Sequence, residues 1–230
     1  MVLVCHSRGL VYLKTRKTAG TSAEMCLERA LTGEEVAEQA HAWTDGDITV
    51  GHRMIPANRQ TDLDRQWYNH MTATEVKAAI GADRFDAALK VACARNPYDM
   101  VLSRFHWTEA RRKTPPPATP DEHRRRFEEF LETVDGIASH DVVHDGDTFV
   151  PDLLIRFETL SEDLKALCDR LGLPFDPSFL PVTKATRDRR GGLSVADYFT
   201  PRTRRFVRDR MGWLFTRAGY DDTLPSESAA

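Results

Sequence analysis

A strand that runs through a basic turn into a helix is the feature that most constrains the fold of this chain. In LVYLKTRKTAGTSAEMCLERAL, residues 10–31, a short apolar run is followed by a turn that holds Lys17 and Gly20. An amphipathic pattern with helical spacing covers residues 22–31. The first segment predicts a strand and the last a helix. A strand that leads directly into a helix is typical of α/β proteins.

The same alternation continues along the chain. Further strands are predicted at residues 88–95 and 152–158. Helices are predicted over residues 98 to about 112, 123–134, 161–173 and 201–220. Pro97 suits a first helical turn, Ser161 is the expected N-cap of its helix, and the prolines of residues 113–122 predict a stiff loop. Strands alternating with helices predict an α/β fold with one parallel β-sheet flanked by helices.

Length and composition limit what the chain can be. We expect its 230 residues to form one domain over residues 1–222, followed by a flexible tail over residues 223–230. The formal net charge of -3 disfavours nucleic acid as a partner. No apolar run approaches the roughly 18–20 residues of a membrane span, and the N-terminus lacks the pattern of a signal peptide. Four widely spaced cysteines without a CxxC pair predict reduced thiols, no metal site and a cytoplasmic protein.

The turn between the first strand and its helix has the composition of an anion site. A helix N-terminus offers unpaired N–H groups and a partial positive charge. Gly20 allows close approach of the backbone, Thr18, Thr21 and Ser22 add hydroxyl groups, and Lys17 adds a full charge. The alternative is an ordinary strand-to-helix turn with an exposed lysine. The segment is not a Walker A loop, because Lys17 precedes the glycine instead of following it.

A second basic element lies in ACARNPYDMVLSRF. Arg95 follows the predicted buried strand, and Ser103 lies about two helical turns further on. Ligands of α/β proteins bind at the carboxyl ends of strands, where Arg95 could hold a phosphate through two hydrogen bonds. The alternative is a capped helix start with Arg95 in a surface ion pair.

Together these segments resemble the sulfotransferases that use 3′-phosphoadenosine 5′-phosphosulfate (PAPS), in particular their bacterial and carbohydrate-type branch. KTAGTS is similar to the 5′-phosphosulfate loop of that family, and ARNPYDMVLSRF to its 3′-phosphate segment. IRFETLSEDLKALCDRLGLP and DYFTPRTRRFVRDRMGWLFTRAGYD are similar to later segments, in the same order. The resemblance implies a P-loop NTPase-like sulfotransferase fold, PAPS as co-substrate, and 3′-phosphoadenosine 5′-phosphate (PAP) as product.

The resemblance also implies roles for individual residues. Lys17 would contact the bridging and sulfuryl oxygens and offset charge on the leaving phosphate. Arg95 and Ser103 would bind the 3′-phosphate. The 5′-phosphate would be wrapped by the loop residues Arg16, Lys17, Thr18, Ala19, Gly20, Thr21 and Ser22. The reaction would be an in-line displacement at sulfur, which needs positioning and electrostatic stabilisation but no metal.

A hydroxyl acceptor needs a general base, and two histidines are candidates. His52, in VGHRMIP, resembles the Gly-His of glycan uronyl sulfotransferases. His70, in WYNHMTATEVKAAIG, resembles a histidine of short bacterial members, with Asn69 in place of a lysine. The sequence does not choose between them, and Glu24 and Asp99 are the carboxylate alternatives.

A third basic segment, KATRDRRGGLS, contains the loop 187–192. By the resemblance, Arg189 and Arg190 would grip the 3′-phosphate, although an exposed charged loop is an equally good interpretation. The acceptor is expected to be a small molecule, a saccharide or a natural product, and a homodimer is compatible with the sequence. The alternatives to a sulfotransferase are a P-loop kinase for a small molecule and a non-catalytic nucleotide-binding member of the fold.

Overall fold

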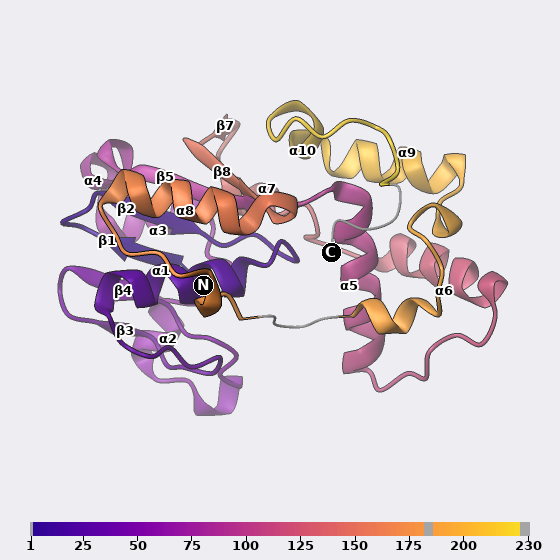
Figure 1. Ribbon diagram of the computed structural model, residues 1–230, viewed down its shortest axis with the longest axis horizontal. Coiled ribbons are helices and arrows are strands. Elements are labelled where there is room, and N and C mark those ends of the chain that lie inside the picture. The colour runs from indigo at the N-terminus through magenta and orange to yellow at the C-terminus, as the bar shows by residue number, and fades with distance from the viewer. Residues whose placement is uncertain (1, 182–185, 226–230) are drawn as a thin grey trace. The chain divides into compact units, whose positions relative to one another are not determined.

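The computed structural model describes residues 2–181 and 186–225, and the side chain of residue 187 is not described. It groups the chain into two compact units (Figure 1). The sheet unit comprises Met1–Cys93 and Ser139–Thr183, and the helical unit comprises Ala94–Ala138 and Lys184–Ala230. Both units are discontinuous in sequence, and a single domain over residues 1–222 stays a prediction. Most of the predicted tail, residues 226–230, lies outside the described residues.

The sheet has six strands in the order β3-β4-β1-β2-β5-β8. Their bounds are β1 Val2–Cys5, β2 Leu10–Leu13, β3 Trp43–Thr44, β4 Ile48–Val50, β5 Leu89–Ala94 and β8 Leu153–Arg156. β2 and β5 pair in parallel, as predicted. β1 pairs antiparallel with both β2 and β4, and β3 pairs antiparallel with β4. The α/β fold with a central sheet is confirmed, but the expectation of a wholly parallel sheet is wrong.

A tight turn explains the antiparallel part of the sheet. Only residues 6–9 separate β1 from β2, and Gly9 has a φ of 54°. So short a connection can join antiparallel strands, whereas parallel strands need a crossover of a dozen residues or more. The connection from β2 to β5 contains several helices and permits the parallel pairing.

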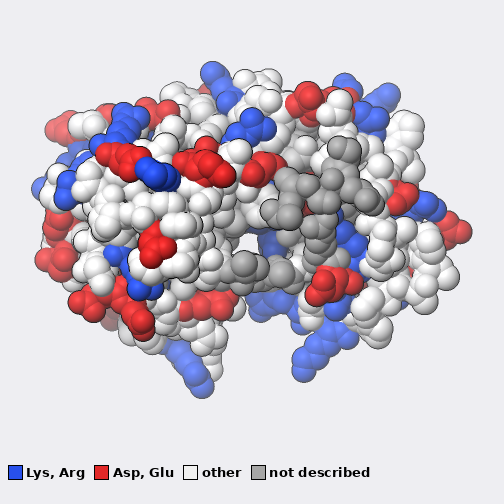
Figure 2. Space-filling view, in the orientation of Figure 1, with Lys and Arg blue, Asp and Glu red and all other residues white. Residues whose placement is uncertain are grey.

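Helices α1 (Gly20–Thr32) and α8 (Leu160–Leu171) pack against the sheet and against each other. Leu3, Tyr12 and Val91 from the strands meet Leu27 and Leu164 from the helices in one buried cluster. Figure 1 shows α8 crossing in front of the strands, and Figure 2 shows side chains of both charges along its outer side. Hydrophobic burial on one face of each helix therefore fixes α1, and with it the basic turn, against the sheet.

Short elements complete the sheet unit. They are η1 (Ala57–Arg59), α2 (Asp62–Gln66), α3 (Ala73–Ile80), α4 (Ala82–Ala87), α7 (His140–Val143), β6 (His144–Asp145), β7 (Thr148–Phe149), η2 (Phe157–Thr159) and η3 (Pro177–Phe179). β6 and β7 form a separate antiparallel pair. α8 begins at Leu160, after Thr159, so Ser161 is not its N-cap. The predicted stop at Gly172 is confirmed, because that residue takes the left-handed conformation of a C-cap.

The helical unit contains α5 (Pro97–Arg111), α6 (Pro120–Thr133), η4 (Arg187–Arg190), η5 (Ala196–Tyr198), α9 (Pro201–Arg210) and α10 (Gly212–Thr216). Its core is aromatic, with Tyr98, Phe105, Phe127 and Tyr198 fully buried. Pro97 lies in the first turn of α5, as predicted. The predicted single C-terminal helix is wrong, because the helical backbone breaks at Met211, just before Gly212. Glycine has a low helix propensity, which favours a break at this position.

The structure bears on two predictions, the unpaired cysteines and the lack of a membrane span. The four cysteines are free and buried, so the prediction of unpaired thiols is confirmed. Among residues 2–181 and 186–225, every helix is too short or too polar to cross a lipid bilayer.

Candidate functional site

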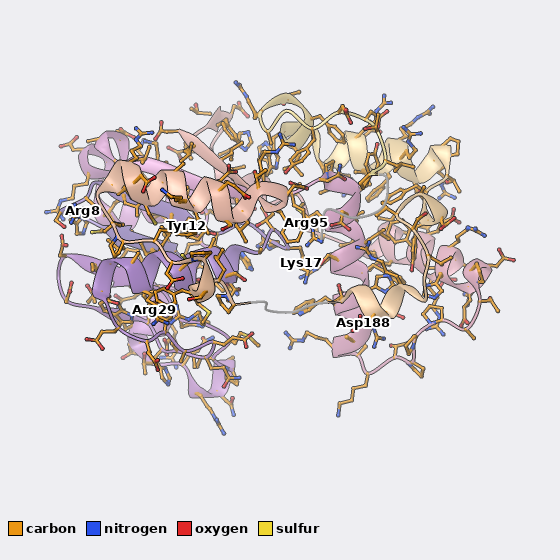
Figure 3. All side chains as sticks on the ribbon, viewed as in Figure 1. Arg8, Tyr12, Lys17, Arg29, Arg95 and Asp188 are labelled. Carbon is orange, nitrogen blue, oxygen red and sulfur yellow. The ribbon has the colours of Figure 1, made fainter. Side chains whose placement is uncertain are left out.

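The basic turn between β2 and α1 has a strained backbone. Lys17 and Ala19 have φ values of 63° and 59°, in the left-handed region that residues with side chains seldom adopt. Ala19 is also the N-cap of α1, and its methyl side chain cannot accept a hydrogen bond from the first turn. A turn with left-handed residues directly before an uncapped helix gathers backbone N–H groups in the way that anion sites require. Figure 3 shows Lys17 in this turn, beyond the strand that carries Tyr12.

Gly20 is required where this turn meets the helix. A Cβ atom at this position would lie 2.9 Å from Cγ of Lys14 and 3.3 Å from the hydroxyl oxygen of Tyr12. That hydroxyl donates a hydrogen bond of 3.1 Å to the carbonyl of Gly20. The close packing explains the glycine, and it keeps the first turn of α1 against β2.

Side chains of the sheet unit anchor the loop 14–20 at several further points. Thr15 Oγ1 donates to the carbonyl of Cys93 at 2.6 Å and lies 2.8 Å from Thr18 Oγ1. Ser22 Oγ donates to the carbonyl of Pro181 at 2.6 Å. The hydroxyls of Thr18 and Ser22 therefore already bond to other protein groups. An anion would be bound mainly by backbone N–H groups of the loop.

Beneath the loop lies a buried ionic network that the sequence did not predict. Lys14 Nζ lies 3.1 Å from a carboxylate oxygen of Glu24, and Arg53 pairs with both Glu24 and Glu28. All four side chains are buried. A weak signal was present, because Glu24 and Glu28 are one turn apart on an otherwise apolar helix face. Glu24, an alternative base in the sequence, has both carboxylate oxygens engaged by cations.

His70 lies directly beside the loop. Its Nδ1 is 2.8 Å from the carbonyl oxygen of Lys14. A carbonyl only accepts hydrogen bonds, so Nδ1 carries the proton and Nε2 keeps its lone pair. Burial lowers the pKa of His70 well below its usual range, although the bond to the Lys14 carbonyl acts in the opposite direction. His70 is thus a neutral imidazole of fixed tautomer, and its φ of 63° is another left-handed value.

His52 lies in a different environment of the same unit. Its Nε2 is 3.3 Å from the amide nitrogen of Gln60, and its Nδ1 is buried without a partner among the described residues. Burial lowers the pKa of His52, against the opposing effect of Asp64. Because the amide of Gln60 donates to Nε2, the proton of His52 lies on the enclosed Nδ1. Nδ1 is therefore enclosed, and the lone pair of Nε2 is already engaged by Gln60.

The second group of predicted residues lies in the helical unit. Arg95 lies two residues before α5 (Figure 3) and donates through Nε to Asp99 at 2.7 Å. Arg190, from η4, pairs with the other carboxylate oxygen of Asp99. The structure thus brings together Arg95 and Arg190, which are far apart in sequence, on one carboxylate. The side chains of Arg95 and Arg190 are each only 13% exposed.

This arrangement revises the surface ion pair that was the alternative for Arg95. The pair exists, at the helical spacing of four residues, but it is largely buried and shared with a second arginine. Burial alone would raise the pKa of Asp99. The adjacent guanidinium groups outweigh this effect and hold the pKa of Asp99 below its usual range. Asp99 is therefore ionised and fully engaged, which makes it a poor candidate for a general base.

Arg189 and Ser103 complete this group. Arg189 donates to the carbonyl of Thr114 at 2.7 Å. The Nε atoms of Arg189 and Arg190 are buried and have no hydrogen-bond partner among the described residues. Ser103 is buried within α5. Buried guanidinium donors without partners are costly for a protein, and a bound anion would satisfy them.

A buried histidine pair holds the segment that follows Arg190. The hydroxyl of Tyr198 lies 3.1 Å from Nε2 of His106 and 2.8 Å from Nδ1 of His123. Burial lowers the pKa of His106 to about 3 and also lowers that of His123. The chain of three neutral groups fixes η5 against α5 and α6, and no sequence signal connected these residues.

Comparisons with known proteins do not extend this description. No protein-family model and no curated protein sequence matches the chain. Within the described residues, no three histidine, cysteine, aspartate or glutamate side chains gather closely enough to hold a metal ion.

Proposed function

We propose that this protein is a sulfotransferase that moves the sulfuryl group of PAPS to a hydroxyl group of an acceptor. One observation carries the proposal, namely that Arg95 and Arg190 share the carboxylate of Asp99. An anion loop alone would serve a kinase equally well. A second cluster of buried guanidinium groups, formed by residues that the resemblance assigns to the 3′-phosphate, favours a donor with two phosphorylated ends.

The loop 14–20 is assigned to the 5′-phosphosulfate. Its two left-handed residues and the uncapped start of α1 suit an anion with several oxygens. The loop is held by hydrogen bonds to Tyr12, Cys93 and Ser139. A site that is already organised does not have to reorganise during the reaction, which is how electrostatic catalysis is most effective.

Lys17 is assigned to the bond that breaks. In the transfer, an acceptor oxygen forms a bond to sulfur while the bond from sulfur to the bridging phosphate oxygen breaks. The products are a sulfate ester and PAP, and the proton of the acceptor hydroxyl passes to a base. Negative charge grows on the leaving phosphate, and the ammonium group of Lys17 would stabilise it.

His70 is the better of the two candidate bases. Its Nδ1–H bond to the Lys14 carbonyl leaves the lone pair on Nε2, and its lowered pKa keeps it neutral near pH 7. The Nε2 of His52 accepts from Gln60, and its Nδ1 is enclosed. A general base needs an accessible lone pair within reach of the proton that it removes. We therefore assign the proton transfer to His70 and a structural role to His52.

The acceptor is proposed to be a small molecule, a saccharide or a natural product with a free hydroxyl group. The test is to incubate the protein with sulfur-labelled PAPS and a panel of hydroxylated acceptors. We expect PAP and a labelled sulfate ester in equal amounts, and both to form far more slowly with the Lys17→Ala variant. Consumption of ATP with Mg²⁺ in place of PAPS would contradict the proposal and favour a kinase.

A further inference from the structure

Ser139 holds a residue of the loop instead of capping its own helix. It occupies the N-cap position of α7, where a serine side chain normally accepts a hydrogen bond from the first turn. No such bond forms. The Ser139 hydroxyl instead accepts the backbone N–H of Arg16 at 2.9 Å. Ser139 is only 1% exposed, so the accepting side of this contact is buried.

Strained backbone from three segments gathers at the same place. Lys17, Ala19, His70 and Ser139 are four of the six described non-glycine residues with positive φ. His70 bonds to the carbonyl of Lys14, and Ser139 to the N–H of Arg16. Such conformations persist only where the surrounding structure enforces them, and they concentrate at functional sites. The strain therefore centres on the backbone of residues 14–19.

The same segment also holds the side chain of Arg16. The guanidinium group lies 3.4 Å from the carboxylate of Asp141, two residues after Ser139. Arg16 is thus held at its backbone and at its side chain by residues that are more than a hundred positions away. The surface ion pair contributes little to stability, whereas loss of the hydrogen bond to the buried Ser139 hydroxyl would leave the N–H of Arg16 without that partner.

We infer that Ser139 is a positioning residue for the anion loop, whose hydroxyl fixes Arg16 so that the following left-handed turn is ready for the 5′-phosphate. The inference rests on the proposed function for the identity of the anion. The effect on the backbone of Arg16 does not depend on that identity.

Two substitutions separate the hydroxyl from the backbone conformation. Ser139→Ala removes the acceptor and keeps a side chain in a left-handed position, whereas Ser139→Gly removes the acceptor and relieves the strain. Ser7→Ala is the matched control in the same unit, because Ser7 makes an exposed hydrogen bond of 2.6 Å to Asp47. The glycine variant keeps the test valid if the alanine variant folds poorly.

The measurements are nucleotide affinity by calorimetry and amide hydrogen exchange by NMR. We expect both Ser139 variants to bind AMP and PAP roughly tenfold more weakly, by the same factor for each nucleotide, because only the 5′-phosphate loop is loosened. The Arg16 amide should exchange faster in both variants and remain unchanged in Ser7→Ala. Wild-type affinity in Ser139→Gly, or in both variants, would overturn the inference.

The two proposals fail in different ways. If the wild-type protein binds neither nucleotide, the proposed function fails, and the exchange of the Arg16 amide decides the role of Ser139 by itself. Faster exchange in both variants would support that role, and unchanged exchange would overturn it. If the wild-type protein binds both nucleotides and the variants match it, only the role of Ser139 fails.

Discussion

The loop 14–20 and the Arg95–Asp99–Arg190 cluster are two candidate anion sites that are built on different physical terms. Neutral hydrogen bonds organise the loop, to Tyr12, Cys93, Ser139 and the imidazole of His70. Charge organises the cluster, with two guanidinium groups on one largely buried carboxylate. The loop would bind an anion mainly through its backbone N–H groups, whereas the cluster would bind one through its guanidinium groups.

This difference predicts how anion binding at each site depends on salt concentration. Neutral hydrogen bonds between enclosed groups change little with salt, whereas binding by guanidinium groups is weakened by screening. In the cluster, Asp99 holds the arginines in place before an anion arrives and lowers the net charge that the anion meets. In the loop, Lys14 pairs with Glu24 beneath it, and Arg16 pairs with Asp141 at its edge.

The largest effect is expected at His70, because it serves both the loop and the chemistry. His70→Asn keeps a side-chain N–H that can donate to the Lys14 carbonyl, and asparagine tolerates left-handed φ. It removes the base, so turnover should fall by about 10²–10⁴-fold while PAP affinity persists. His70→Ala should lose both turnover and affinity. If His70→Asn keeps near-normal turnover and His52→Ala does not, the roles of the two histidines are reversed.

The pH dependence of kcat/KM gives a second test of His70 as the general base. The folded-state pKa of His70 lies well below about 6.5, so the neutral base persists as pH falls below the ordinary histidine value. For wild type, kcat/KM should stay flat from pH 8 down to about 6.5 and decline only at lower pH. A decline centred near pH 6.5 to 7 would contradict the buried, neutral state of His70.

The next largest effect is expected at Lys17. Lys17→Ala should lower turnover by roughly a hundredfold or more, the scale of losing one preorganised electrostatic group. The fold should survive, because the loop is held by other residues, and circular dichroism checks this. Lys17→Arg is the companion variant, since it keeps the charge and changes the geometry. Unchanged turnover in Lys17→Ala would show that the loop does not act on the leaving group.

A smaller and more selective effect is expected at Arg190. Arg190→Ala should weaken PAP binding roughly tenfold to a hundredfold, the range for charged hydrogen bonds, and leave AMP binding unchanged. The salt dependence of PAP affinity should also become shallower. Arg205, an exposed arginine of α9, provides the matched control. Equal losses for PAP and AMP in Arg190→Ala would remove the distinction between the two sites.

The smallest effect concerns stability near the cluster. His106 and His123 have lowered pKa values in the fold, so the unfolded chain binds more protons once pH falls below about 6.5. Stability should therefore drop between pH 7.5 and 5, by about 2 kcal/mol for His106, and His123 should act in the same direction. His106→Asn should show a smaller drop than wild type in urea unfolding at the two pH values. An identical drop in both proteins would mean that His106 is not held neutral.

Local patterns allowed much of the framework to be predicted. The strands β2 and β5, helix α1 and the proline in the first turn of α5 follow from hydrophobic periodicity and helix-start signals. The antiparallel part of the sheet depends on how β1 folds back through residues 6–9, a turn without a strong sequence signal. Strand direction is a tertiary property, and alternation of elements along the chain does not determine it.

Contacts of the candidate site could be predicted from the sequence only where the contacting residues are close together in the chain. Arg95 and Asp99 lie one helical turn apart, but the approach of Arg190 is a tertiary contact that only the family resemblance anticipated. Ser139 carried no signal, because its partner Arg16 is remote and a serine before a helix normally suggests a cap. The ionic network of Lys14, Glu24 and Arg53 was missed because charged residues are rarely buried.

The most direct test compares PAP with AMP as ligands of the wild-type protein, by thermal unfolding and calorimetry. The two nucleotides share the 5′-phosphate that is assigned to the loop, and only PAP has the 3′-phosphate that is assigned to Arg95, Ser103 and Arg190. A ligand that binds only the folded state raises the melting temperature, and at equal ligand concentration the rise is larger for the tighter ligand. We predict a clear rise with PAP and a much smaller rise with AMP. Equal shifts with both nucleotides, or none with PAP, would contradict the proposal that this protein holds a nucleotide by both of its phosphorylated ends.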